Sequence, residues 1–317
     1  LLSGEGGLES AEPTRAMIRL AYFAQLTPAL SALILETDAK DTLEKLSQSE
    51  YPEFYRQVED YIDRYGFRCM SEMKLEEIDL HGDPSYLFSN LKNYIKSGKL
   101  SLPEDADDKS LRHEAEKKVA AHLRGVKKIF YFWVLKHARK AVKNRENTRF
   151  ARTRIYGVAR TMFQAIGEDL AAQKILKRSR DLFWLTIEEV FGVYNGTLPS
   201  YDLQNLVELR RKSYEKFTDD TDPRVMTRGP VYWNNLFVHE IDAPKYDTNE
   251  DCDLKGLPCC PGILEGVVKV IQSPQDDLTL NGEILVTTRT DPGWVPLYPS
   301  ISGLLVERGS LLSHSAI

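Results

Sequence analysis

The sequence predicts a mainly α-helical domain over residues 1–245, a linker over 246–260 and a smaller domain with β-strands over 261–317. Apolar residues recur at helical spacing through most of the first 240 residues, which is the pattern of amphipathic helices. Prolines and aspartates then gather between Pro244 and Pro261, which is typical of a loop. After Pro261 the apolar residues come in short β-branched runs, which predict strands. A chain of 317 residues is long enough for two domains.

The helical part divides into six expected segments. Helices are predicted over residues 16–35, 51–65, 85–98, 111–144, 155–170 and 201–214. Pro13, shortly after Ser10, marks a helix start. Gly66 and Gly98 are expected to end the second and third helices, because glycine adopts the left-handed conformation that closes a helix.

The segment around residues 145–170 has two contrasting faces. One stripe of apolar residues at steps of three or four consists of Ile155, Val158, Met162, Ile166 and Leu170. The opposite face carries charged residues, namely Arg145, Glu146, Arg149, Arg152, Arg154 and Arg160. Charge ladders of this kind are common on helix surfaces, so we interpret this face as solvent-exposed.

Three strands are expected in the last part of the chain. The β-rich runs cover residues 263–271, 283–288 and 303–307. Asn281 and Gly282 form a turn signal before the second of them.

Composition excludes several classes of partner. The net charge is −5 and no long block of one sign is present, so neither nucleic acid nor an anionic membrane is expected as a partner. No apolar run approaches the roughly 20 residues of a membrane span. The four cysteines do not form a disulfide framework, and Cys252, Cys259 and Cys260 lack a histidine at ligand spacing, so no metal site is predicted. A reducing, cytoplasmic location is expected.

The residues with most chemical interest lie at the end of the chain. A predicted strand ends at Glu307, a turn follows at Gly309, and His314 then stands where a helix is expected to begin. Free N–H groups and the dipole at a helix N-terminus favour an anion, and Ser313 and Ser315 add hydroxyl donors. A neutral imidazole here is a candidate acceptor of a phosphoryl group. A purely structural histidine is the alternative at this point.

Two arginines flank this segment. Arg289 and Arg308 are candidate phosphate contacts, since guanidinium groups bind phosphate oxygens in pairs of hydrogen bonds. Glycine at position 309 would let the backbone approach an incoming phosphoryl donor closely.

Three motifs in the same region carry a family resemblance. Residues 291–297 (DPGWVPL), 303–309 (GLLVERG) and 312–317 (LSHSAI) resemble, in this order, the swivelling phosphohistidine domain of PEP-utilising enzymes. Residues 261–266 (PGILEG) are similar to the motif that opens this domain. The family includes phosphoenolpyruvate synthase, pyruvate phosphate dikinase and rifampicin phosphotransferase. The resemblance implies a β/β/α swivelling domain, here C-terminally incomplete, in which His314 takes a phosphoryl group from ATP and passes it on.

The helical part has a resemblance of its own. Segments 64–76, 145–149, 181–185 and 206–210 resemble the helical substrate domain of rifampicin-phosphotransferase-like proteins. Candidate residues of this domain are Arg68, Glu72, Lys74 and Glu76. They would form a polar wall of the substrate cleft or a docking surface for the mobile domain, and a charged helix face is the alternative. The aromatic residues 130–133 would line an apolar pocket for a bulky substrate or belong to an ordinary core.

The resemblance also implies what the chain works with. ATP and Mg²⁺ would bind to an ATP-grasp domain that this chain lacks, and that domain would be a partner together with a small-molecule acceptor. The chain is expected to be a piece of a longer protein, since it starts without Met and stops three residues after His314, and to be inactive alone.

The function expected is phosphotransfer from phosphohistidine to a small molecule, in a dikinase-type enzyme of the rifampicin phosphotransferase layout. One alternative is a phosphoenolpyruvate synthase-like enzyme that acts on pyruvate. Pyruvate enzymes of the family tend to carry Thr where this sequence has Leu312, which leans away from that alternative. The other alternative is a non-catalytic helical binding module with a degenerate histidine domain.

Overall fold

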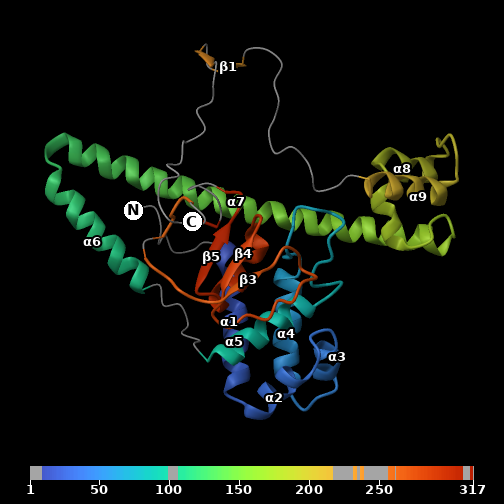
Figure 1. The fold of residues 1–317 in the computed structure, drawn as a ribbon, viewed down its shortest axis with the longest axis horizontal. Helices are drawn as coiled ribbons and strands as arrows, with labels where there is room; N and C mark the ends of the chain where they lie inside the picture. Colours follow the sequence, from blue (N-terminus) through green and yellow to red (C-terminus); the bar gives the residue numbers. More distant parts are fainter. Residues whose placement is uncertain are drawn as a thin grey trace. The chain divides into compact units, whose positions relative to one another are not determined.

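The computed structural model describes residues 9–98, 106–216, 231–233, 236–238, 256–260, 262–309 and 315–316 (Figure 1). The chain forms two compact units. Unit 1 comprises Leu1–Gln164 together with Cys260–Ile317, and unit 2 comprises Ala165–Cys259. The C-terminal segment, by which we mean residues 260–309, thus packs with the first half of the chain. The domain bounds expected from the sequence stay a prediction.

Unit 1 is built on a group of short helices. After the 3-10 turn η1 (Glu9–Ala11) come α1 (Glu12–Gln25), α2 (Pro28–Glu36), α3 (Thr42–Ser47), α4 (Pro52–Tyr65) and α5 (Ser85–Ser97). The first of these, α1, packs against α4 and α5. Their shared core is apolar and fully buried, and includes Met17, Leu30, Phe54, Leu87 and Phe88.

The helix ends follow the chain's turn residues. Gly98 has φ +59°, the left-handed conformation expected at the end of α5. The stretch 16–35, expected as one helix, is divided because Thr27 is extended ahead of Pro28, as the residue before a proline tends to be. The described residues contain no single helix long and apolar enough to cross a membrane, and α1 with α2 meets that criterion only as a pair bent by 115°.

Two longer helices follow, α6 (Ala106–His122) and α7 (Gly125–Ala172). Figure 1 shows α7 as a long continuous helix. The break between them falls at Gly125, where φ is +60°, a conformation that glycine adopts without strain. The ion pair of Arg139 with Glu116, 2.5 Å long, joins α7 to α6.

The faces of α7 differ from the expectation at several residues. Ile155, Val158 and Met162 are all more than 60% exposed, whereas Arg160 and Glu146 are 3% and 5% exposed. Arg160 packs inward because its side chain finds partners in the polar loop after α4, described below, whereas Arg145, Arg152 and Arg154 on the same face are exposed as expected. The interpretation of this face as a solvent-exposed charge ladder is wrong for Arg160 and Glu146.

The C-terminal segment contains a small parallel sheet. Strands β3 (Val268–Val270), β4 (Ile284–Thr287) and β5 (Gly303–Val306) lie in this order, and the 3-10 helix η3 (Pro292–Ser300) connects β4 to β5. Val268 pairs with Ile284, and Ile284 with Gly303. The expected strands are confirmed, although β3 is shorter than predicted.

This segment shares its core with the loop after α4. Leu278, Leu285, Trp294 and Leu297 pack together with Met70, and Tyr86 covers the cluster. The fold is thus mostly helical, with a small three-stranded parallel sheet near the C-terminus, as the sequence predicted at this level.

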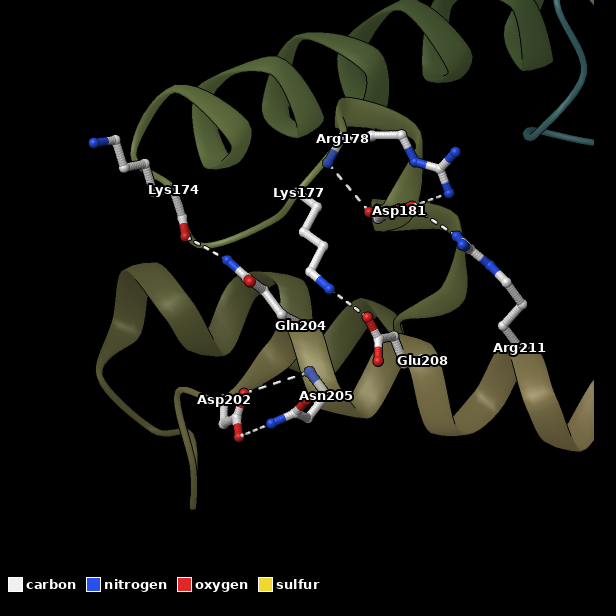
Figure 2. A network of polar contacts seen from close by, with 9 residues as sticks. All are labelled: Lys174, Lys177, Arg178, Asp181, Asp202, Gln204, Asn205, Glu208 and Arg211. Atoms are coloured by element: carbon white, nitrogen blue, oxygen red, sulfur yellow. Dashed lines mark hydrogen bonds and ion pairs between the residues drawn. The ribbon is translucent and has the colours of Figure 1, made fainter.

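Unit 2 contains the end of α7, the 3-10 helix η2 (Ser179–Trp184), α8 (Ile187–Asn195), α9 (Leu203–Tyr214), β1 (Val231–Trp233) and β2 (Leu236–Val238). Figure 2 shows the polar network that joins its helices. The carboxylate of Asp181 forms ion pairs with Arg178 at 3.4 Å and with Arg211 at 2.8 Å. Lys177 forms an ion pair with Glu208. These contacts hold η2 on α9 and explain why both segments are rich in charge.

The antiparallel hairpin of β1 and β2 was not expected in the helical part. Its residues, VYW and LFV, are β-branched or aromatic apart from one leucine, which favours strands. Most of the predicted linker, residues 246–255, lies outside the described residues.

Candidate functional site

The carboxyl ends of the parallel strands meet at one edge of the sheet. The backbone N–H of Glu307 donates to Thr287 O at 3.0 Å, and that of Arg308 donates to Thr288 O at 2.9 Å. Gln272, after β3, accepts from the Thr288 hydroxyl at 2.7 Å. This edge is where ligands bind in open α/β sheets. The chain leading to His314 leaves from the same edge.

The two candidate phosphate-binding arginines lie at this edge. Arg289 follows β4 and Arg308 follows β5, and both are exposed. Arg308 has its guanidinium 3.8 Å from Glu307. Gly309 is likewise exposed. Because the two arginines come from adjacent strands, the structure brings them to the same end of the sheet.

The proposed phosphate carrier itself lies outside what the structure describes. His314 and Ser313 both lie outside the described residues. Ser315, which follows His314, is described and is half-buried in a turn. The expectation that His314 stands at a helix N-terminus therefore stays a prediction.

A polar loop lies between α4 and α5, at residues 66–84, and we call it the bridging loop. It contains no helix, so the alternative of a charged helix face does not apply to its four candidate residues. Arg68 donates to both carboxylate oxygens of Glu72, at 2.9 and 2.7 Å, and both side chains are buried. Arg68 also lies over the ring of Phe150, 5.0 Å from its centre.

The other two candidates, Lys74 and Glu76, are exposed. Lys74 lies 4.0 Å from Glu77. The structure therefore brings Arg68 and Glu72 together and leaves Lys74 and Glu76 at the surface of the same loop.

The bridging loop contacts the C-terminal segment through Asp291. One carboxylate oxygen of Asp291 accepts from the backbone N–H of Ser71 and the other from that of Gly293, both at 2.8 Å. Burial raises the pKa of Asp291, although these two N–H groups and the charges of Arg68 and Arg289 oppose the rise. Asp291 thus connects the bridging loop to the residues that follow β4 by hydrogen bonds.

Glu72 lies in a strongly perturbed environment. Burial raises its pKa to about 7, and the negative charge of Asp291 adds to the rise, while Arg68 and Arg149 lower it. A carboxyl group that titrates near neutral pH is a frequent feature of functional sites. The carboxyl groups of Glu72 and Asp291 therefore influence each other, and the charge of Arg68 acts on both.

The same loop contacts α7. Arg160 donates to Asp79 at 3.1 Å and to the carbonyl oxygens of Glu72 and Lys74 at 3.0 and 2.9 Å. Arg149 lies 3.7 Å from Glu146. The bridging loop thus holds α7 on one side and the C-terminal segment on the other.

Helix α5 supplies further contacts that the sequence reasoning did not single out. Asn93 donates to Leu278 O at 2.7 Å and accepts from the N–H of Leu280 at 3.1 Å. Tyr86 donates to Gly293 O at 2.7 Å, and Tyr94 donates to Pro296 O. The only sequence signal was weak, namely polar residues on the apolar stripe of this helix.

The aromatic run of α7 is exposed in part. Phe130 and Trp133 are 64% and 57% exposed, and their rings stack with centres 6.2 Å apart. Trp133 also contacts His137, 4.3 Å between ring centres. These residues do not form a buried core, so the interpretation as an ordinary core is wrong for them.

Comparison with known proteins gives two family matches. Residues 1–146 match the family described as "Rifampicin phosphotransferase fourth domain". Residues 279–317 match "PEP-utilising enzyme, mobile domain". The second match covers the strands β4 and β5, the helix η3 and the proposed carrier His314.

Whole-chain relatives agree with these matches. The chain is 26% identical to a rifampicin phosphotransferase of Bacillus cereus over 97% of its length, and 27% identical to one of Streptomyces sviceus over its whole length. It is 27% identical to one of Bacillus subtilis over 82% of its length. The chain spans about a third of these relatives, namely 35%, 36% and 30% of their lengths.

The two family matches and the relatives together support a place for this chain among the PEP-utilising enzymes. Within it, the chain is rifampicin phosphotransferase-like, both in its helical part and along nearly its whole length.

Proposed function

We propose that this chain is the acceptor-side part of an ATP-dependent phosphotransferase, in which His314 carries the phosphoryl group. The observation that supports this most directly is the docked C-terminal segment. Its motif residue Asp291 bonds to the bridging loop, so the sheet that precedes His314 is held on the helical part. We take residues 1–245 as the substrate-binding domain and 261–317 as part of a β/β/α swivelling domain.

The chemistry follows from a neutral imidazole. In the first step a ring nitrogen of His314 would attack the β-phosphorus of ATP, so that an N–P bond forms, the bond from this phosphorus to the oxygen of the α-phosphate breaks, AMP leaves and the histidine carries a diphosphate. Transfer of the terminal phosphate to water completes the dikinase-type reaction. In the second step an acceptor hydroxyl attacks the phosphohistidine, an O–P bond forms, the N–P bond breaks and the hydroxyl proton passes to a base. Arg289 and Arg308 would balance the charge on the transferred group.

The carrier must visit two sites, and a swivelling domain can supply that motion on the microsecond-to-millisecond scale. Among the described residues, no three His, Cys, Asp or Glu side chains gather where they could hold a metal ion. Because of the family resemblance we assign ATP and Mg²⁺ to an ATP-grasp domain of the whole protein, and we expect a cytoplasmic location.

The proposed acceptor is a bulky molecule with a hydroxyl group. The exposed, stacked rings of Phe130 and Trp133 offer a large apolar surface on α7, which is the kind of surface that such a molecule requires. The names of the relatives make rifampicin the first compound to test.

The decisive experiment labels the whole protein with ATP that carries radioactive phosphorus at the β position. We expect an acid-labile, base-stable label that is absent from His314→Ala. The matched control is His122→Ala, an exposed histidine on α6, which keeps the label. A label that persists in His314→Ala overturns the proposal.

Product analysis then separates the remaining alternatives. Release of label to rifampicin but not to pyruvate supports the proposed acceptor class, and the reverse favours a phosphoenolpyruvate synthase-like enzyme. A wild-type protein that takes up no label is a binding module. We also expect the isolated 317-residue chain not to turn over ATP.

A further inference from the structure

Unit 1 contains a pocket that the proposed phosphotransfer does not use. Its volume is about 550 Å³, and it lies where the end of α4, the bridging loop and α7 meet. Arg64 comes from α4, Phe67 and His81 from the loop, and Arg154 and Val158 from α7. Cationic and apolar groups therefore line the same hollow.

His81 is oriented by a buried carboxylate. Its ring nitrogen Nδ1 lies 3.4 Å from Asp79, which is 6% exposed and is itself held by Arg160 at 3.1 Å. The backbone N–H of His81 also donates to Asp79, at 3.1 Å. Because Nδ1 is engaged in this way, Nε2 is the nitrogen that remains for a ligand in the pocket.

The Asp79 contact also favours the charged form of His81. The hydrogen bond that the His81 ring donates to Asp79 raises the pKa of His81, against a lowering by burial. Burial would raise the pKa of Asp79, but the hydrogen bonds from His81 and Arg160 outweigh it and the pKa lies below its ordinary value. The pair therefore presents a positive imidazolium to the pocket more readily than an isolated histidine would.

Arg154 is the second cation. Its guanidinium lies 5.6 Å from the centre of the Phe67 ring and 5.0 Å from that of Phe150. None of the ion pairs found within the described part of the chain involves Arg154, while Arg64 pairs with Asp60 at 3.0 Å. The two rings orient the planar guanidinium and leave its N–H groups available.

We propose that this pocket binds a small organic anion, in which a phosphate or carboxylate group lies against His81 and Arg154 and an apolar or aromatic body lies against Phe67 and Val158. A guanidinium and an imidazolium are the donors that bind such oxyanions in proteins. One carboxylate, Asp63, also lines the pocket. The charges of Asp63 and Arg64 cancel, so Arg154 and a protonated His81 leave the lining with a net positive charge. The proposal does not rest on His314 and goes beyond the proposed transfer.

The test uses the 317-residue chain with ¹³C-labelled histidine and follows the His81 ring signal by NMR. The signal is assigned by its absence from His81→Gln. Phenyl phosphate, benzoate, inorganic phosphate and phenol are titrated in turn. We expect phenyl phosphate or benzoate to shift the His81 signal in a saturable manner, and phenol not to do so. Comparison of the two anions tells a phosphate site from a carboxylate site.

Variants then test the second cation. Arg154→Gln should weaken binding of the better anion about tenfold, which is the effect of one lost charged hydrogen bond. The matched control is Arg152→Gln, an exposed arginine on the same helix that does not line the pocket. It should bind as the wild type does. Absence of saturable binding by either organic anion, equal binding of phenol, or equal losses in the two variants would overturn the proposal.

Discussion

Asp291 accepts a hydrogen bond of 2.8 Å from the backbone N–H of Ser71, a residue 220 positions earlier in the chain. Next to Ser71, Met70 is buried in the core of the C-terminal segment. The family's mobile domain and the helical part are therefore in direct contact here through both a polar and an apolar interaction. In the proposed function, swivelling would have to break these contacts, and their strength would affect how long the proposed carrier stays at the acceptor side.

The first prediction concerns pH. The pKa of Glu72 is about 7 in the folded chain against an ordinary 4.5, so the folded state binds more protons than the unfolded state between these values. Its contribution to stability is complete below pH 4.5 and is lost as the pH rises through 7. The difference corresponds to about 3 kcal/mol. Urea unfolding from pH 5 to 8 should show this fall, and Glu72→Gln should flatten it. Glu76→Gln, on the exposed side of the loop, should keep the slope of the wild type.

The second prediction concerns the close approach at η3. A Cβ atom on Gly293 would overlap the carbonyl group of Cys69, which is backbone and cannot turn away. Gly293→Ala should therefore lower the free energy of unfolding by about 1–3 kcal/mol. Gly256→Ala is the control, because a Cβ there meets nothing within 4 Å. Thermal unfolding of the two variants measures the difference. Equal losses of stability in both variants would contradict the close approach seen at Gly293.

The third prediction concerns Asn93, which is 2% exposed and bonds twice to the backbone around Leu278. Asn93→Ala leaves two buried backbone groups unsatisfied, which costs about 1–3 kcal/mol for each group. Amide hydrogen exchange at Leu280 should accelerate as the segment releases from α5. Asn90→Ala is the matched control, because the Asn90 amide donates to Tyr86 O within its own helix and not to the C-terminal segment. Unchanged exchange at Leu280 in Asn93→Ala would show that this contact does not hold the segment.

The fourth prediction concerns the aromatic surface of α7. Trp133→Ser removes an exposed ring, so stability should change by less than about 0.5 kcal/mol. The whole protein should, however, require a higher concentration of acceptor, with the histidine labelling by ATP unaltered. Ile155→Ser serves as the comparison, because Ile155 is also exposed on the same helix, at 69% against 57% for Trp133. A large loss of stability in Trp133→Ser would mean that the ring is part of a core.

The sequence was most informative where a local rule decides the structure. Gly98 ends α5 and the β-branched runs form β4 and β5, because left-handed glycine and β-propensity act over a few residues. The motif that includes Asp291 could be recognised, and the family matches confirm that recognition. The motif alone points to His314 as the carrier, and both this role and the surroundings of His314 stay a prediction.

The sequence was least informative where burial depends on distant partners. Arg160 looked like a surface residue of a helix, yet it is buried because Asp79 and two carbonyl groups of the bridging loop surround it. Helical periodicity shows which residues share a face but does not show which face is covered. For the same reason the buried pair of Arg68 and Glu72 could be named as a candidate, but its raised carboxyl pKa could not be foreseen.

The hydrogen bonds described above from α5 to the C-terminal segment all end on main-chain atoms of that segment, while Tyr86 also packs against its apolar cluster. Asn93, Tyr86 and Tyr94 all bond to backbone N–H or C=O groups there, and none of these bonds reads a particular side chain. Substitutions in that segment can therefore accumulate without matching changes in α5, provided that the backbone path is kept. Chimeras that exchange this segment between relatives of low identity should consequently assemble on the same helix.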